Sequence, residues 1–192
     1  MKKIGLIMGG LMLMATPAHA IPGQTIDEAA VWMQSNSTVR PSANEKFLVR
    51  RVNTAAQQLT FNASVMSPGK LTRLAPGGRI IRSETLSLFD MRNGVTLARL
   101  WESVRSIYGL DIAQDFAQSA IVKTYPTEAR IQEAVTKQNA QLAAQQGELR
   151  QGERFAYWLE VAQTENGKAY SGQLTVFLLD DLEKLRSELA NR

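Results

Sequence analysis

The sequence feature that most constrains the fold is an Asn166-Gly167 pair between two runs of alternating residues. Asn-Gly is the strongest short-range hairpin signal, because both residues accept the positive φ angles of a two-residue type I′ turn. If Glu165 opposes Lys168 across this turn, one face of the hairpin carries large apolar side chains, namely Phe155, Tyr157, Leu159, Val161, Leu174, Val176 and Leu178. Turn chemistry and hydrophobic pattern therefore predict the same register.

Further strands are predicted upstream of the hairpin. Alternating or β-branched runs extend from Phe47 to Val52, from Leu59 to Met66, from Arg79 to Asp90 and from Ala117 to Tyr125. Two Pro-Gly clusters separate the second run from the third, which predicts a long exposed loop or a short extra strand.

Helical patterns fill most of the remaining chain. Thr25 and Glu28 form a capping-box pattern for a helix ending near Gln34. Asn93 is placed to cap a helix from Gly94 to Tyr108, whose apolar residues recur every three or four positions. A long helix is expected from Pro126 to about Gln146. The Gln- and Ala-rich stretch at 137–151 is interpreted as a solvated helix face. A last helix is expected from Asp180 to about Ala190.

This order of elements predicts an α+β fold, with an antiparallel sheet of about five to six strands and helices packed on it. Residues 21–192 are expected to form a single domain, because no repeat or strong linker divides them.

The first twenty residues have the three parts of a cleavable signal peptide. Lys2 and Lys3 precede an uncharged apolar run, and Ala18-His19-Ala20 fits an A-x-A cleavage site. We therefore expect an exported protein, periplasmic or secreted, or in a thylakoid lumen if the organism has one. No transmembrane segment is expected after cleavage.

Composition excludes several chemistries. The chain has no cysteine, and its one histidine, His19, lies in the predicted signal peptide. A mature chain without imidazole or thiol cannot build a Ser-His-Asp triad, a cysteine nucleophile or the usual zinc, haem and iron–sulfur sites. We expect no cofactor and no metal, and we assign no catalytic residue. Asp111 and Asp115 are interpreted as flanking a turn after Gly109, and Asp180 and Asp181 as opening a helix.

The charge distribution is uneven. Between Arg40 and Arg105 there are eleven basic and four acidic residues, while the two ends are acidic. One hypothesis is that a basic face binds an anionic partner, such as a polyanionic glycan, a lipid head group or an acidic protein surface. Its candidate residues are Lys70, Arg73, Arg79 and Arg82. The alternative is that the acidic ends neutralise these charges. Nucleic acid is not an expected partner, because no aromatic residue lies between these charges.

Trp158 is the remaining candidate binding residue, because the predicted register points it away from the apolar face of the hairpin. It belongs to a core if a helix covers that side, and to a binding surface otherwise. The sequence thus favours a non-enzymatic interaction or accessory protein of the cell envelope. The alternative is a small carboxylate-dependent, glycan-directed hydrolase, which requires two carboxyl groups ~5–9.5 Å apart in a cleft.

Overall fold

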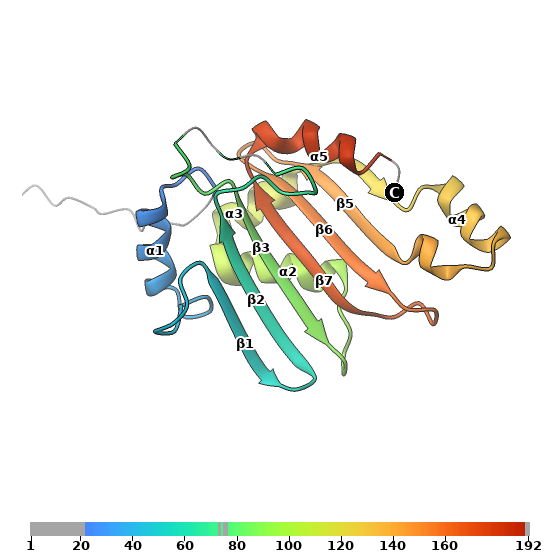
Figure 1. Cartoon of the computed structure of the whole chain (residues 1–192), viewed down its shortest axis with the longest axis horizontal. Coiled ribbons are helices and arrows are strands. Elements are labelled where there is room, and N and C mark those ends of the chain that lie inside the picture. The colour runs from blue at the N-terminus through green and yellow to red at the C-terminus, as the bar shows by residue number, and fades with distance from the viewer. Residues whose placement is uncertain (1–21, 73, 75–76, 191–192) are drawn as a thin grey trace, which may run out of the picture.

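The computed structural model describes residues 22–72, 74 and 77–190, and seven strands in this part of the chain form one antiparallel sheet (Figure 1). The strand order is β1-β2-β3-β7-β6-β5-β4. The pairing of β3 with β7 joins the N-terminal strands to the C-terminal ones. The bounds are β1 Leu48–Thr54, β2 Gln57–Ser64, β3 Ser83–Asp90, β4 Ala120–Tyr125, β5 Gln145–Gln151, β6 Ala156–Gln163 and β7 Ala169–Phe177.

The β6–β7 hairpin has the predicted register. Tyr157 opposes Val176, Leu159 opposes Leu174, and Trp158 opposes Thr175. The predicted two-residue turn is wrong, however. The Thr164 N–H donates to the Lys168 carbonyl and the Gly167 N–H to the Thr164 carbonyl, and the register shifts between Ala162 and Gln163. One extra residue on β7, Tyr170, forms a bulge next to the turn, while the buried face holds the rest of the register.

Three helices cover one face of the sheet: α1 Ile26–Ser35, α2 Leu97–Tyr108 and α3 Leu110–Gln118. In Figure 1, α2 and α3 lie behind the sheet. Each of these helices contributes apolar side chains to the main core, which they share with the sheet residues Phe61, Leu86, Tyr157, Leu159, Leu174 and Val176. Fully burying one such side chain stabilises the fold by about 1.5–3 kcal/mol.

The opposite face of the sheet, here called the open face, is covered only at one end. Helix α5, Leu182–Glu188, follows a 3-10 turn at Leu179–Asp181 and packs on this end. A second core lies between α5 and the sheet and contains Tyr125, Leu149, Ala156, Trp158, Phe177, Leu182, Leu185 and Leu189. Helix α4, Glu128–Thr136, and a 3-10 turn at Ala140–Ala143 connect β4 to β5. The rest of the open face carries no helix in the described part of the chain (Figure 1).

The predicted α+β class and the antiparallel sheet with packed helices are confirmed, as is the capping box of α1. The long helix predicted from Pro126 to Gln146 is wrong, because α4 ends at Thr136 and β5 begins at Gln145. Gln138 has a φ of 49°, which stops the helix. Strand β5 is the strand that the sequence analysis missed, and its backbone pairing on both sides overrides the helix tolerance of Gln and Ala.

Two further corrections concern the segment after β3. Helix α2 begins at Leu97 with Thr96 as its cap, not at Gly94 with Asn93, because Asp90 binds Asn93 and Gly94 has a φ of 78°. The segment after Gly109 is helix α3 rather than a turn.

The predicted signal peptide, residues 1–20, lies outside the described residues. Within them, none of the helices has the length and apolar character needed to cross a membrane.

Candidate functional site

A row of polar residues crosses the open face from strand to strand. Backbone pairing places Thr60 beside Ser87, Ser87 beside Gln173, and Gln173 beside Glu160. The row continues through Gly147 to Tyr125 on β4. We call Thr60, Ser87, Gln173 and Glu160 the polar row. Strands lie ~4.8 Å apart, so its four members span ~14 Å at right angles to the strands.

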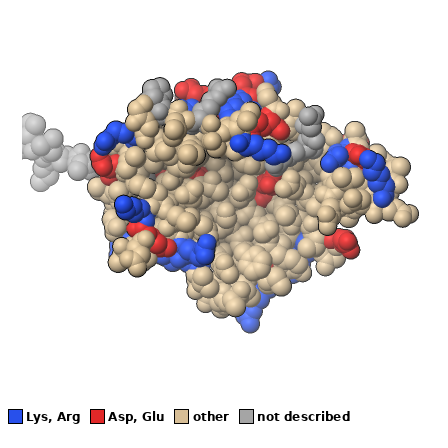
Figure 2. Space-filling view, in the orientation of Figure 1, with Lys and Arg blue, Asp and Glu red and all other residues tan. Residues whose placement is uncertain are grey.

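The polar row forms the floor of a groove of about 290 Å³. Its lining residues are Gln58, Thr60, Ser87, Leu88, Phe89, Glu160, Ala162, Ser171, Gly172 and Gln173. Figure 2 shows this face mainly in tan, with most Lys, Arg, Asp and Glu side chains toward its rim. The lining thus offers hydroxyl and amide groups, which both donate and accept hydrogen bonds, together with one carboxylate and one aromatic ring.

Glu160 is the one acid that lines this groove among the described residues, and its carboxylate is held in place. The Tyr125 hydroxyl donates to Glu160 Oε2 at 2.6 Å and accepts from Trp158 Nε1 at 2.7 Å. Gly147 makes room for this arrangement, because a Cβ there would lie 2.5 Å from the Tyr125 hydroxyl and 2.3 Å from the Leu159 carbonyl oxygen. The chain Trp158–Tyr125–Glu160 therefore fixes the carboxylate at one end of the polar row.

A second depression of about 270 Å³ adjoins the groove, because Gln173 lines both. Its other lining residues are Gly69, Lys70, Trp158, Leu185, Glu188 and Leu189. The structure thus brings together two of the predicted binding residues, Lys70 and Trp158. Trp158 is 8% exposed and packs in the core under α5, although its ring borders this depression.

The other predicted residues do not join this site. Arg82 donates from Nε and Nη2 to the Asp181 carboxylate at 2.9 and 2.8 Å, and both side chains are largely buried. These hydrogen bonds raise the pKa of Arg82, so the arginine stays charged and neutralised in place. Arg79 contacts Asp27 at 3.3 Å on the surface. Arg73 lies outside the described residues.

A larger depression, of about 450 Å³, lies between α4 and the end of the hairpin. Apolar and small residues of α4 and the following 3-10 turn, including Ile131, Val135, Ala140 and Ala143, make up much of its lining. Directed hydrogen bonds give a binding site its specificity. Polar side chains make up six of the ten residues that line the groove on the open face, against six of the fourteen that line this depression, so the groove is the better candidate.

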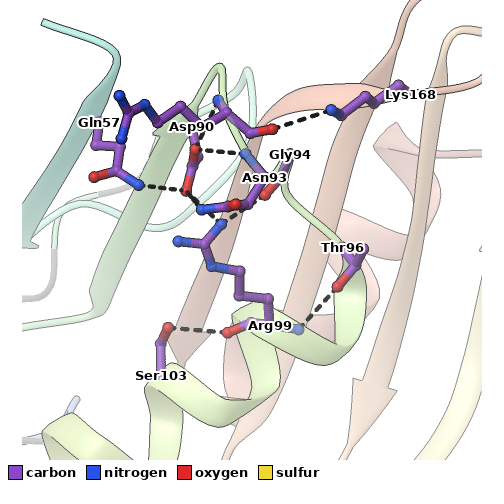
Figure 3. Close-up of polar contacts among 9 residues, drawn as sticks. Gln57, Asp90, Asn93, Gly94, Thr96, Arg99, Ser103 and Lys168 are labelled. Atoms are coloured by element: carbon purple, nitrogen blue, oxygen red, sulfur yellow. Dashed lines mark hydrogen bonds and ion pairs between the residues drawn. The ribbon is translucent and has the colours of Figure 1, made fainter.

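The carboxylate of Asp90, at the end of β3, lies at the centre of the polar contacts shown in Figure 3. Its carboxylate accepts from the N–H groups of Arg92 and Asn93, both at 3.0 Å, and from Gln57 Nε2 at 3.1 Å, and it forms an ion pair with Arg99 at 2.6 Å. The hydrogen bonds, led by that of the Asn93 N–H, hold the pKa of Asp90 well below its usual range. These contacts fix the connection from β3 to α2, which leaves the carboxylate a structural group.

Two buried acids face the main core and not the groove. Asp115 accepts from the N–H groups of Glu153 and Arg154 and from the Tyr157 hydroxyl. Glu84 is fully buried, and burial raises its pKa to about 8 against a smaller opposing effect of the Tyr108 hydroxyl. Neither acid lines the groove with Glu160. In the described part of the chain, no three acids cluster as metal ligands would.

Sequence reasoning missed the polar row. The available signal was the Ser, Thr and Gln content of the outward positions in three strands. Comparison of the chain with family models, curated proteins and solved structures found no match, so no relative supplies a function.

Proposed function

We propose that the protein is an exported, non-enzymatic accessory protein of the cell envelope that binds a neutral glycan chain along the polar row. The observation that carries this proposal is the alignment of Thr60, Ser87, Gln173 and Glu160 across four neighbouring strands. An elongated ligand rich in hydroxyl groups matches such a row, because each strand presents one hydrogen-bonding side chain to it.

The charge of the groove supports a neutral ligand. No Lys or Arg is among the residues that line the groove, and Arg50, which pairs with Thr60, lies beyond its β2 end. The charge that a ligand in the groove meets is the Glu160 carboxylate, which repels an anion. A carboxylate has about four acceptor sites, so Glu160 can accept from ligand hydroxyl groups while the Tyr125 hydroxyl holds it in place. Such charge-assisted hydrogen bonds are stronger than neutral ones. Phe89 adds an aromatic surface at the edge of the groove, against which the apolar side of a sugar ring packs.

A binding role fits the acids of the groove better than hydrolysis does. Both retaining and inverting hydrolysis use a pair of carboxyl groups on opposite sides of the bond that breaks. Glu160 is the one carboxylate that lines the groove among the described residues. We therefore expect the ligand to leave the groove unchanged.

The experiment is calorimetric titration of the full chain with neutral oligosaccharides, chosen first on a glycan array. We expect Ser87→Leu, which fills the middle of the row, to abolish binding, and Glu160→Gln to weaken it about tenfold, the typical loss for a hydrogen bond to a charged group. Ser106→Leu on the exposed side of α2 is the matched control and should bind normally.

Two results would contradict the proposal. Unchanged affinity of the Ser87→Leu variant would place the ligand elsewhere. Cleavage of the oligosaccharide by the wild-type chain, lost in Glu160→Gln, would show a hydrolase instead.

A further inference from the structure

The loop between β2 and β3 exposes apolar side chains among basic ones. Leu71 and Leu74 are 69% and 60% exposed, and Met66 and Ile80 are 44% and 37% exposed. From residue 66 to residue 80 the sequence contains Lys70, Arg73 and Arg79 but neither Asp nor Glu. Exposed apolar side chains gathered in one segment mark an interaction surface. We call the described residues of this segment, 66–72, 74 and 77–80, the basic loop.

The first part of the basic loop is held on α5 through its backbone. Glu188 accepts from the N–H groups of Lys70 at 2.6 Å and Leu71 at 3.3 Å, and Lys184 donates to the Pro68 carbonyl. Gly69 permits this approach, because a Cβ there would lie 2.3 Å from Glu188 Oε2. These bonds use the main chain, so the side chains of Lys70 and Leu71 stay exposed.

The far end of the basic loop is also fixed, while its turn projects. The Ile26 N–H donates to the Arg79 carbonyl at 2.9 Å, which ties the loop to the start of α1. A Cβ added at Gly77 or Gly78 would meet no atom within 4 Å. Arg79 and Asp27 form an ion pair of largely exposed side chains, and such pairs are weak enough to exchange partners. The basic loop is therefore a supported projection and not a groove.

We propose that the basic loop docks on an anionic phospholipid surface, with Leu71 and Leu74 entering the interfacial layer and the side chains of Lys70 and Arg79 contacting lipid phosphates. Apolar side chains interleaved with basic ones are the composition of segments that bind such interfaces. A polyanionic glycan would use the cations and leave Leu71 and Leu74 in water. A stable protein partner would need ~800 Å² of complementary surface on each side, which a projecting turn does not offer. This docking does not use the groove itself, although Lys70 also lines the depression beside it.

The first test is co-sedimentation of the full chain with vesicles of phosphatidylcholine alone and with vesicles containing phosphatidylglycerol. We expect partition into the anionic vesicles, reduced at least tenfold by the double variant Leu71→Ser/Leu74→Ser and about fivefold by Lys70→Ala. The matched controls are Leu110→Ser, which is 60% exposed on α3, and Lys46→Ala, and both should partition like the wild type.

The second test reports insertion directly and uses the absence of cysteine from the chain. An environment-sensitive dye on Leu74→Cys should shift its emission to the blue on anionic vesicles, and the same dye on Leu110→Cys should not. Equal partition into both kinds of vesicle, no partition at low ionic strength, or loss of binding in Lys70→Ala but not in the double leucine variant would overturn the proposal. The last pattern would indicate a polyanion or an acidic protein surface as the partner.

Discussion

Replacing Glu84 with glutamine is expected to stabilise the protein at neutral pH. Glu84 lies on the core face of β3, is 0% exposed, and neither of its carboxyl oxygens has a hydrogen-bond partner of good geometry among the described residues. The folded protein therefore holds this side chain in its neutral form at pH 7, because burial raises its pKa to about 8. In the unfolded chain the same carboxyl group ionises near pH 4.5.

The size of the effect follows from this difference in pKa. Between pH 4.5 and about 8 the folded state binds one proton that the unfolded state has released, so the stability of the wild type falls as pH rises. The loss is ~1.36 kcal/mol for each pH unit, which gives about 3 kcal/mol at pH 7 and a plateau near ~5 kcal/mol above pH 8. Glutamine does not titrate and avoids this cost.

Urea unfolding of the wild type and Glu84→Gln at several pH values between 4.5 and 9 measures the effect. The difference in unfolding free energy should be near zero at pH 4.5 and should increase toward pH 8. Glu102→Gln, at an exposed position of α2, is the control and should show no such increase. A difference that is independent of pH would refute the reasoning, because it would mean that Glu84 ionises alike in both states.

Three further predictions concern polar contacts. Tyr125→Phe removes the acceptor of the Trp158 N–H and should lower the unfolding free energy by ~1–2 kcal/mol, measured by urea unfolding followed by tryptophan fluorescence; an unchanged midpoint would contradict it. Arg82→Met leaves Asp181 buried without its cation and should cost ~3 kcal/mol in thermal unfolding, much of which Arg82→Met/Asp181→Leu should restore. Asp90→Asn should lower the unfolding free energy by its full amount above pH 3.8, the usual pKa of Asp in an unfolded chain. The loss should become smaller as pH falls below 3.8, because the wild type then loses the stability that comes from the lowered pKa of folded Asp90. A loss that stays constant in acid unfolding would exclude this origin.

Local patterns predicted the elements whose signals agree with each other. The hairpin register was predictable because turn residues and alternation point to one pairing. Helix α1 was predictable because Thr25 and Glu28 form the hydrogen bonds of a capping box at its start. Strand β5 was not predictable, because its Gln-rich sequence shows no strong alternation of apolar and polar residues. It becomes a strand only through pairing with its neighbours β4 and β6.

The candidate site depends on contacts that no local pattern contains. The polar row exists because β3 pairs with β7, which places Ser87 beside Gln173 although they are far apart in the sequence. Likewise, the sequence made Arg82 a candidate for binding an anionic partner or for neutralisation by the acidic ends, and its ion pair with Asp181 forms only when α5 folds onto the sheet. Lys70 and Trp158 were identified separately, and the fold brings both to one depression.

The most direct test of glycan binding along the polar row is an NMR titration that maps amide shift changes. Adding the neutral oligosaccharide with the highest array signal should shift the amides of Thr60, Ser87, Glu160 and Gln173 together, along one line across β2, β3, β7 and β6. Shift changes confined to α4, to the basic loop or to the helix-covered face would contradict the assignment of the groove as the binding site.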